Sequence, residues 1–292
     1  MRYFIAVAEH GNFTRAADEL HVAQQAVSQQ IRALEATLSV SLLRRSPRKV
    51  ELTPAGEVFL GDAKRVIAAS ERAVRRVQAV ARGEAGTLRL VYTLATAYQT
   101  TPALLDLLGR RYPGLNVVAR EVFGADVPKL LLEGDCDLAL APMTTYPAGL
   151  RQRLVRRELL RLAVSSRHSL AGADQVDLLA LKDQRFEVWP RQMSPGYYDV
   201  VVGACRAAGF EPSLDEHGAG STVWGYIAKG RGAGLVVSSL FEQLPAGITL
   251  VDLTPPRPTL AINAVWVDDG EVPAIGRFLD AAAAFAAEHG WQ

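Results

Sequence analysis

The sequence predicts an N-terminal winged helix-turn-helix, a linker helix, and a C-terminal α/β domain built as a two-lobed clamshell. Three observations support this architecture. Short helical periodicities lead into a basic hairpin within residues 1–56, a long amphipathic helix follows Pro54, and strands alternate with helices from Thr87 onward. A chain of 292 residues is long enough for more than one domain.

Composition excludes several classes of protein. The chain has 32 Lys and Arg against 31 Asp and Glu, so a wholly basic, histone-like binder is excluded. The charge is uneven, however, because residues 1–86 hold 13 basic and 9 acidic side chains. Two cysteines cannot form a disulfide scaffold or a Cys-rich zinc site. No apolar run is long enough to span a membrane and the N-terminus lacks a cleavage site, so we expect no membrane partner and a cytoplasmic location.

Three helices are expected before the hairpin. Gly11-Asn12 ends the first helix, and Thr14 is the predicted cap of the second. The third runs from about Ala23 to Leu38. The apolar positions of the three helices share one face in each, as expected for a common core: Phe4, Val7, Ala8, Ala16, Ala17, Leu20, Val27, Ile31 and Leu34.

The other side of the third helix carries Gln25, Ser28, Gln29 and Arg32. Glutamine amides can pair with adenine in the major groove, and an arginine suits a phosphate. Two short helices with a tight turn, the second presenting such a face, describe a helix-turn-helix. A three-helix bundle with a neutral exterior is the alternative that these helices leave open.

A basic hairpin follows the third helix. Ser46-Pro47 is a turn signal between two short apolar strands, which is typical of the wing of a winged helix. A wing beside a recognition helix would place its cations against backbone phosphates, whereas an isolated cluster would be a solvated turn. These cations are Arg44, Arg45, Arg48 and Lys49.

The first 56 residues resemble the LysR-type transcriptional regulators. The resemblance rests on the ordered run Phe4, Val7-Ala8-Glu9, Gly11, Phe13-Thr14, Ala16-Ala17, Leu20, Val22, Gln24, Ala26-Val27-Ser28, Gln30-Ile31, Leu34-Glu35, Leu42-Leu43, Arg45, Leu52-Thr53 and Ala55-Gly56. It implies a sequence-specific DNA-binding regulator controlled by a small-molecule effector. Its implied partners are a double-stranded operator, RNA polymerase if it activates, and copies of itself in a homodimer or homotetramer. Gln24 joins the predicted DNA contacts on this basis.

The sequence departs from the family pattern in several places. Fewer residues than usual precede Arg2. Gln25 stands where proline is common, and Gln29 where many members carry arginine, so the operator sequence cannot be carried over. Ala23 replaces a small hydroxyl residue, which should weaken the cap of the third helix by about 1 kcal/mol.

Residues 57–86 are predicted to form the linker. A helix begins at Pro54 and runs to about Arg82. Its apolar seam indicates packing against a partner helix or against the chain's own domain, and the family resemblance favours the equivalent helix of a second subunit. The seam comprises Phe59, Ala63, Val66, Ser70, Ala73 or Val74, Val77, and Val80 or Ala81.

Residues 87–292 are predicted to form the effector-binding domain, with lobe I at 87–160 and 267–292 and lobe II at 161–266. The order strand, helix, strand, helix, strand over 88–141 indicates a parallel sheet, and a second such set follows. Two lobes joined by two crossings resemble solute-binding proteins. The segments Leu131–Ala139 and Gly230–Val236 carry the family resemblance best in this part.

Several polar residues at strand ends are candidate effector contacts. Thr93 and Thr96 follow the first strand where a helix begins, so they suit a small organic anion such as a carboxylate, or else merely cap the helix. A loop containing Trp189 and Arg191 offers an aromatic wall and a cation, although Arg191 could simply face solvent. The same reasoning adds Ser221, Thr222 and Ser238.

Catalysis is poorly supported. The five histidines lie at no metal-ligand spacing, and no nucleophile elbow or phosphate-binding glycine loop occurs. We therefore expect no enzyme activity, metal or cofactor. A redox pair of Cys136 and Cys205, as in a peroxide-sensing branch of the family, is a minor alternative. A solute-binding protein and an enzyme are the competing classes. The N-terminal 56 residues and the absence of a secretory signal argue against the first, and only a nucleophile with a base in the cleft would support the second.

Overall fold

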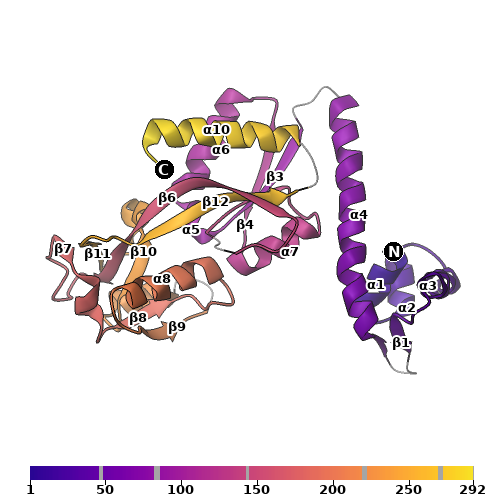
Figure 1. Ribbon diagram of the computed structural model, residues 1–292, viewed down its shortest axis with the longest axis horizontal. Coiled ribbons are helices and arrows are strands. Elements are labelled where there is room, and N and C mark those ends of the chain that lie inside the picture. The colour runs from indigo at the N-terminus through magenta and orange to yellow at the C-terminus, as the bar shows by residue number, and fades with distance from the viewer. Residues whose placement is uncertain (46–48, 82–85, 143–144, 219–221, 269–271, 292) are drawn as a thin grey trace. The chain divides into compact units, whose positions relative to one another are not determined.

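A computed structural model describes residues 1–45, 49–81, 86–142, 145–218, 222–268 and 272–291. They form two compact units, one over Met1–Gln78 and one over most of the chain from Ala79 (Figure 1). The first is helical with a small hairpin, and the second is an α/β domain. Among the described residues, no helix is long and apolar enough to cross a membrane.

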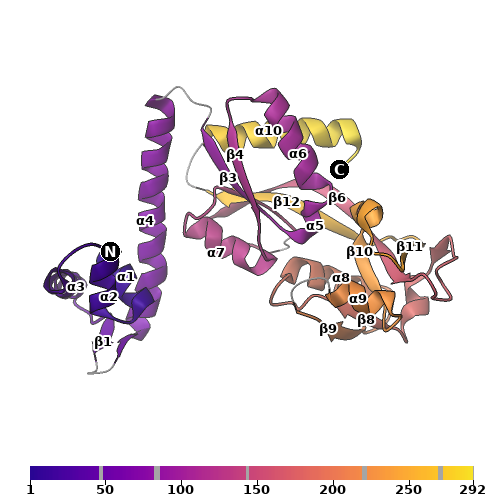
Figure 2. The same ribbon diagram turned by 180° about the vertical axis from the view of Figure 1, so that it is seen from behind.

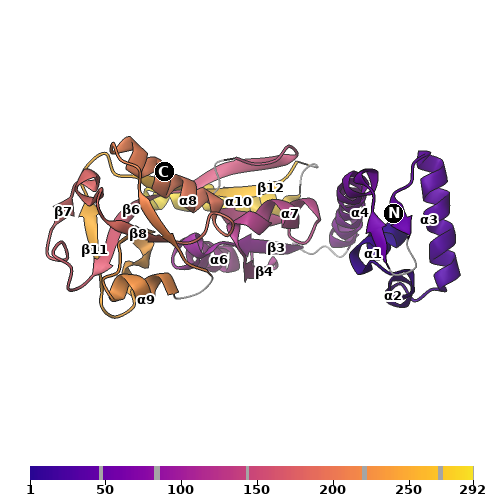
Figure 3. The ribbon, with the colours of Figure 1, turned by 90° about the horizontal axis from the view of Figure 1, so that it is seen from below.

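The N-terminal unit contains the three predicted short helices and all but the last turn of the long one (Figure 3). Its core is a single apolar cluster in which Phe4, Val7, Val27 and Ile31 are completely buried. The helices are α1 (Arg2–His10), α2 (Phe13–Glu19), α3 (Gln24–Leu38) and α4 (Pro54–Ala81).

The helix ends differ in one respect from expectation. Gly11 ends α1 in the left-handed region at φ 58°. The cap of α2 is Asn12, whose side-chain oxygen accepts from the backbone N–H of Thr14 at 2.8 Å and of Arg15 at 3.1 Å. Thr14 therefore lies in the first turn of α2, and its prediction as the cap was wrong. Ala23 makes no side-chain cap bond to α3, as its methyl group requires.

The predicted hairpin is present. Strands β1 (Leu43–Arg45) and β2 (Val50–Leu52) pair antiparallel, with Arg44 opposite Glu51. Glu35 of α3 fixes the entry to β1, because its carboxylate accepts from the backbone N–H of Leu42 at 2.8 Å and of Leu43 at 3.1 Å. Residues 46–48, including Arg48, lie outside the described residues.

The apolar seam predicted on α4 divides into two parts. Phe59 and Ala63 pack into the N-terminal core, and the Phe59 ring lies 5.4 Å from that of Phe4. Val66, Val74 and Val77 are between 51% and 70% exposed. The prediction of one continuous partner-facing seam was thus wrong for Phe59 and Ala63, because the core of their own unit covers them.

The first lobe of the C-terminal unit has the predicted parallel arrangement. Strand β3 lies between β4 and β5 and is parallel to both. Helices α6 and α10 pack on one face of this sheet and α7 on the other (Figures 1 and 2). The elements are β3 (Thr87–Tyr92), α5 (Leu94–Ala97), α6 (Thr100–Arg111), β4 (Asn116–Glu121), a short 3-10 turn (Gly124–Asp126), α7 (Val127–Leu132), β5 (Leu138–Ala141) and α10 (Pro273–His289).

Two long strands carry the chain between the lobes. Strand β6 (Leu150–Ser165) pairs with β12 (Thr259–Val267) along its first part and with β10 and β11 along its last part. Ala264 and Val265 of β12 belong to the cores of lobe I. Leu260 belongs to the core of lobe II, so the second crossing lies between Leu260 and Ala264, before the lobe boundary predicted between residues 266 and 267.

The second lobe has its own apolar core. Strands β8 and β9 form a parallel pair, whereas β10 and β11 extend the main sheet from β6. Its elements are β7 (Gln175–Val176), a 3-10 turn (Leu178–Leu181), β8 (Arg185–Val188), α8 (Pro195–Ala207), β9 (Ser213–Glu216), α9 (Thr222–Ala228), β10 (Gly234–Val237), a 3-10 turn (Ser238–Gln243) and β11 (Ile248–Leu253).

Candidate functional site

The outer face of α3 is available to a large partner. Gln24, Gln25, Gln29 and Arg32 are exposed, and Ser28 is half-buried. Val27 and Ile31 on the opposite face are completely buried, so the apolar stripe fixes the rotation of the helix. This orientation presents amides and one guanidinium to solvent, the groups that hydrogen-bond base edges and phosphates.

The hairpin presents its cations less uniformly. Arg44 is exposed, whereas the Lys49 Nζ lies 2.9 Å from the Glu51 Oε1. Hydrogen bonding to Lys49 and its positive charge lower the pKa of Glu51. Lys49 is thus partly neutralised within the wing, while the side chain of Arg45 lies outside the described residues, like Arg48.

The C-terminal unit contains a cavity of about 330 Å³ between its lobes. Lobe I contributes the loop and short helix after β3 and the segment where β4 ends. Lobe II contributes aromatic and aliphatic side chains. The lining residues are Thr93, Leu94, Ala95, Tyr98, Glu121, Val122, Phe123, Gly124, Trp189, Met193, Ser194, Tyr197, Trp224, Val236, Val237 and Leu240.

Two of the predicted effector contacts line this cavity. Thr93 is 4% exposed, and its Oγ1 has no hydrogen-bond partner among the residues that the structure describes. A buried hydroxyl without a partner is destabilising unless something else satisfies it. Trp189 forms part of the opposite wall and contacts Tyr197 and Trp224 edge-to-face, at centroid distances of 5.5 and 5.6 Å.

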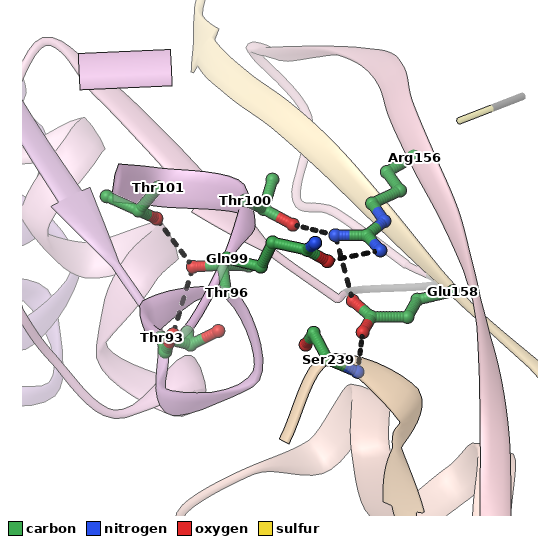
Figure 4. A network of polar contacts seen from close by, with 8 residues as sticks. All are labelled: Thr93, Thr96, Gln99, Thr100, Thr101, Arg156, Glu158 and Ser239. Carbon is green, nitrogen blue, oxygen red and sulfur yellow. Dashed lines mark hydrogen bonds and ion pairs between the residues drawn. The ribbon is translucent and has the colours of Figure 1, made fainter. Parts of the chain in front are cut away.

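Thr96 was predicted to contact the effector, but its side chain lies outside the cavity lining. It is 1% exposed and does not line the cavity. Its hydroxyl donates to the Thr93 carbonyl at 3.0 Å and accepts from the Thr101 hydroxyl at 3.0 Å (Figure 4). Both hydrogen bonds are internal, so Thr96 shapes the loop that holds Thr93.

Arg191 also lies away from the cavity lining. Its guanidinium forms a bidentate salt bridge with half-buried Asp199, with Nε–Oδ1 2.7 Å and Nη2–Oδ2 3.0 Å. Ser238 is half-buried outside the lining. Ser221 and the side chain of Thr222 lie outside the described residues.

A buried polar network beside the cavity was missed from the sequence. The guanidinium of Arg156 donates to Thr100 Oγ1 at 3.1 Å and to Gln99 Oε1 at 2.8 Å, and it lies 3.7 Å from the Glu158 carboxylate (Figure 4). Glu158 also accepts from the Ser239 backbone N–H at 2.7 Å. Burial lowers the pKa of Arg156, and the charge of Glu158 opposes that shift. The network joins α6, β6 and lobe II near the crossing.

Both cysteines are present as thiols. Cys136 and Cys205 are buried in different core clusters. Burial raises the pKa of Cys205 to about 11, which disfavours the thiolate. No group of three or more potential metal ligands occurs among the described residues.

Both parts of the chain match models of known protein families. Residues 1–57 match the model described as "Bacterial regulatory helix-turn-helix protein, lysR family". Residues 81–287 match the model described as "LysR substrate binding domain".

Named relatives match over nearly all of the chain. The HTH-type transcriptional regulator TfdS of Cupriavidus pinatubonensis is 32% identical over 287 residues, covering 97% of this chain and 96% of the relative. ClcR of Pseudomonas putida is 36% identical over 214 residues, or 73% of each chain.

Solved structures agree with the fold. The crystal structure of CbnR, a LysR family transcriptional regulator, matches with a TM-score of 0.73 and 29% identity, covering 97% of this chain and 96% of that chain. Full-length CbnR in complex with its target DNA gives the same TM-score and identity, with 97% of each chain covered.

Proposed function

The chain belongs to the LysR family of bacterial helix-turn-helix regulators, and from this premise we propose that a small molecule bound in its interlobe cavity controls its binding to an operator. Membership of this family makes the chain a DNA-binding transcriptional regulator with an effector-binding domain. The observation that supports the cavity as the effector site is the unpartnered, buried hydroxyl of Thr93 on its wall.

We propose that α3 and the wing make the DNA contacts. The exposed amides of Gln24, Gln25 and Gln29 and the hydroxyl of Ser28 are the groups suited to base edges. Arg32 and the wing cations supply phosphate contacts, which give affinity without sequence preference. Because such a regulator must reach its operator, we propose that the protein is located in the cytoplasm. If it activates transcription, it would also contact RNA polymerase.

We do not retain the prediction that the effector is a small organic anion. Thr93 lines the cavity, but two other groups expected to hold a negative charge do not, because the Thr96 hydroxyl is bonded within its own loop and Arg191 pairs with Asp199. We therefore propose that a small-molecule effector binds in the cavity, without assigning it a carboxylate group.

A thermal-shift screen of small molecules on the full chain tests this proposal, with Ala95→Phe as the matched variant. Ala95 lines the cavity and is half-buried, so a phenyl ring there should fill space that the ligand needs. A true effector at 100 times its Kd should stabilise the parent by about 2.7 kcal/mol and the variant by much less. Equal stabilisation of both proteins would place the effector outside the cavity.

A further inference from the structure

The charge of the cavity lining is opposite to that expected for an anion site. Glu121 is the charged residue in it, and no Lys or Arg occurs among the described lining residues. The nearby guanidinium groups have other partners: Arg156 contacts Gln99, Thr100 and Glu158, and Arg191 contacts Asp199. A ligand carboxylate would enter without a cation to balance it, beside a carboxylate that repels it.

The remaining lining is rich in aromatic rings. Tyr98 and Phe123 of lobe I and Trp189, Tyr197 and Trp224 of lobe II all border the cavity. The electron-rich face of an aromatic ring attracts a cation, and Tyr98 and Phe123 are the rings on the same lobe as Glu121. Aromatic rings together with a carboxylate are the combination that selects ammonium groups.

The exposure of the lining side chains distinguishes a solvent-exposed mouth from a buried interior. Phe123 is 49% exposed and Glu121 is also exposed, so both lie at the mouth. Trp224 is 8% and Tyr197 5% exposed, so these rings form the inner wall. The Tyr197 hydroxyl donates to the Leu235 carbonyl at 2.7 Å, which leaves its ring as the part offered to a ligand.

Glu121 exerts its charge on the cavity wall. Burial raises the pKa of Tyr98, and the negative charge of Glu121 raises it further. Tyr98 therefore stays a neutral phenol in neutral solution. It presents a π-face and a hydroxyl beside the carboxylate, instead of a second negative charge.

The geometry points to an effector that is a small organic ammonium compound, with its apolar body between the rings of lobe II and its cationic end toward Glu121. This inference rests on the proposed function of the cavity and names the chemical class of its ligand. The ammonium group has hydrogen-bond donors and no acceptor. Both the carboxylate of Glu121 and the unpartnered hydroxyl oxygen of Thr93 can accept from it.

Three probes with one shared phenyl group and different charge test the inference. They are 2-phenylethylammonium, neutral 2-phenylethanol and anionic phenylacetate, each titrated into the full chain by isothermal titration calorimetry at neutral pH. We expect the ammonium to bind at least tenfold more tightly than phenylacetate. Glu121→Gln should weaken ammonium binding about three- to tenfold and leave the alcohol unchanged.

Two further variants distinguish the possible outcomes: a matched control, Glu288→Gln, and Ala95→Phe, whose added ring fills the cavity. Glu288→Gln removes another exposed carboxylate, on α10, and should change none of the three affinities. Phenylacetate binding as tightly as the ammonium, no binding by any probe, or an unaffected Glu121→Gln would each overturn the inference. If phenylacetate bound instead and Ala95→Phe abolished its binding, the cavity would remain the effector site and only the ammonium assignment would fail.

Discussion

Gln29 is the residue whose replacement best separates base recognition from phosphate binding. Its amide is exposed on the outer face of α3, opposite buried Val27 and Ile31, so Gln29→Ala should leave the fold intact. We expect a loss of about 1–3 kcal/mol on the specific site and little loss on random DNA. Fluorescence anisotropy with both DNAs measures this, and an equal loss on the two would show that Gln29 reads no base.

Two neighbouring threonines should respond differently to replacement by valine, which keeps the volume and removes the hydroxyl. Thr93→Val removes an unpartnered group from the cavity wall and should weaken the effector response without loss of stability. Thr96→Val removes two internal hydrogen bonds and should lower the free energy of unfolding by about 1–2 kcal/mol. Urea denaturation combined with ligand titration of both variants checks the pair. The reverse pattern would show that Thr96 is the contact residue.

Single residues also show why the cavity was only partly predictable. Thr93 and Trp189 follow strands, so their local sequence places them at a sheet edge. Tyr98, Glu121 and Trp224 come from three separate segments that only tertiary packing brings together. Arg191 has the right residue type in the right loop, but Asp199 on α8 binds its guanidinium, and no pattern in the sequence showed that pairing.

The wing is the element that should control affinity without controlling sequence preference. Arg45→Ala and Arg48→Ala should each weaken binding to every DNA and reduce the slope of log K against log salt by about one. Arg206→Ala on α8 is the control, since this exposed arginine lies in the C-terminal unit and pairs with Glu211. An unchanged slope for both wing variants would mean that the cluster is only a solvated turn.

Elements with a regular apolar stripe were predicted well, and β6 shows where the prediction stopped. The helix over Gln24–Leu38 and the parallel strands β3, β4 and β5 match their predicted positions closely. Only Leu160–Ser165 of β6 was expected, because residues 151–158 carry five charged side chains and no apolar run. Two of these, Arg156 and Glu158, are buried in the polar network instead of facing water.

Assembly is a property of the whole molecule and depends on α4. This helix spans roughly 42 Å at about 1.5 Å per residue, and Val66, Val74 and Val77 remain exposed along it. Such a stripe favours pairing with the same helix of a second copy. Light scattering at micromolar concentration should give at least twice 31.6 kDa for the parent, and Val77→Asp should shift the mass toward the monomer. A monomeric parent would contradict the pairing.

Control of DNA binding likewise needs the entire chain, because a ligand shifts the protein between DNA-bound arrangements only if it prefers one of them. The cavity lies between lobes that two strands connect, β6 and β12, so a ligand there contacts both lobes at once. Lobe closure is the change that we propose to couple the cavity to the spacing of the two wings in a dimer.

DNase I footprinting of the full chain on its own upstream region, repeated across a titration of the effector found by thermal shift, tests this account most directly. We expect a protected site that excess random DNA does not remove. The pattern of protection should change over the concentration range in which the cavity fills, and Ala95→Phe should keep the ligand-free footprint but lose the change. Protection that random DNA abolishes, or a footprint identical with and without the ligand, would contradict it.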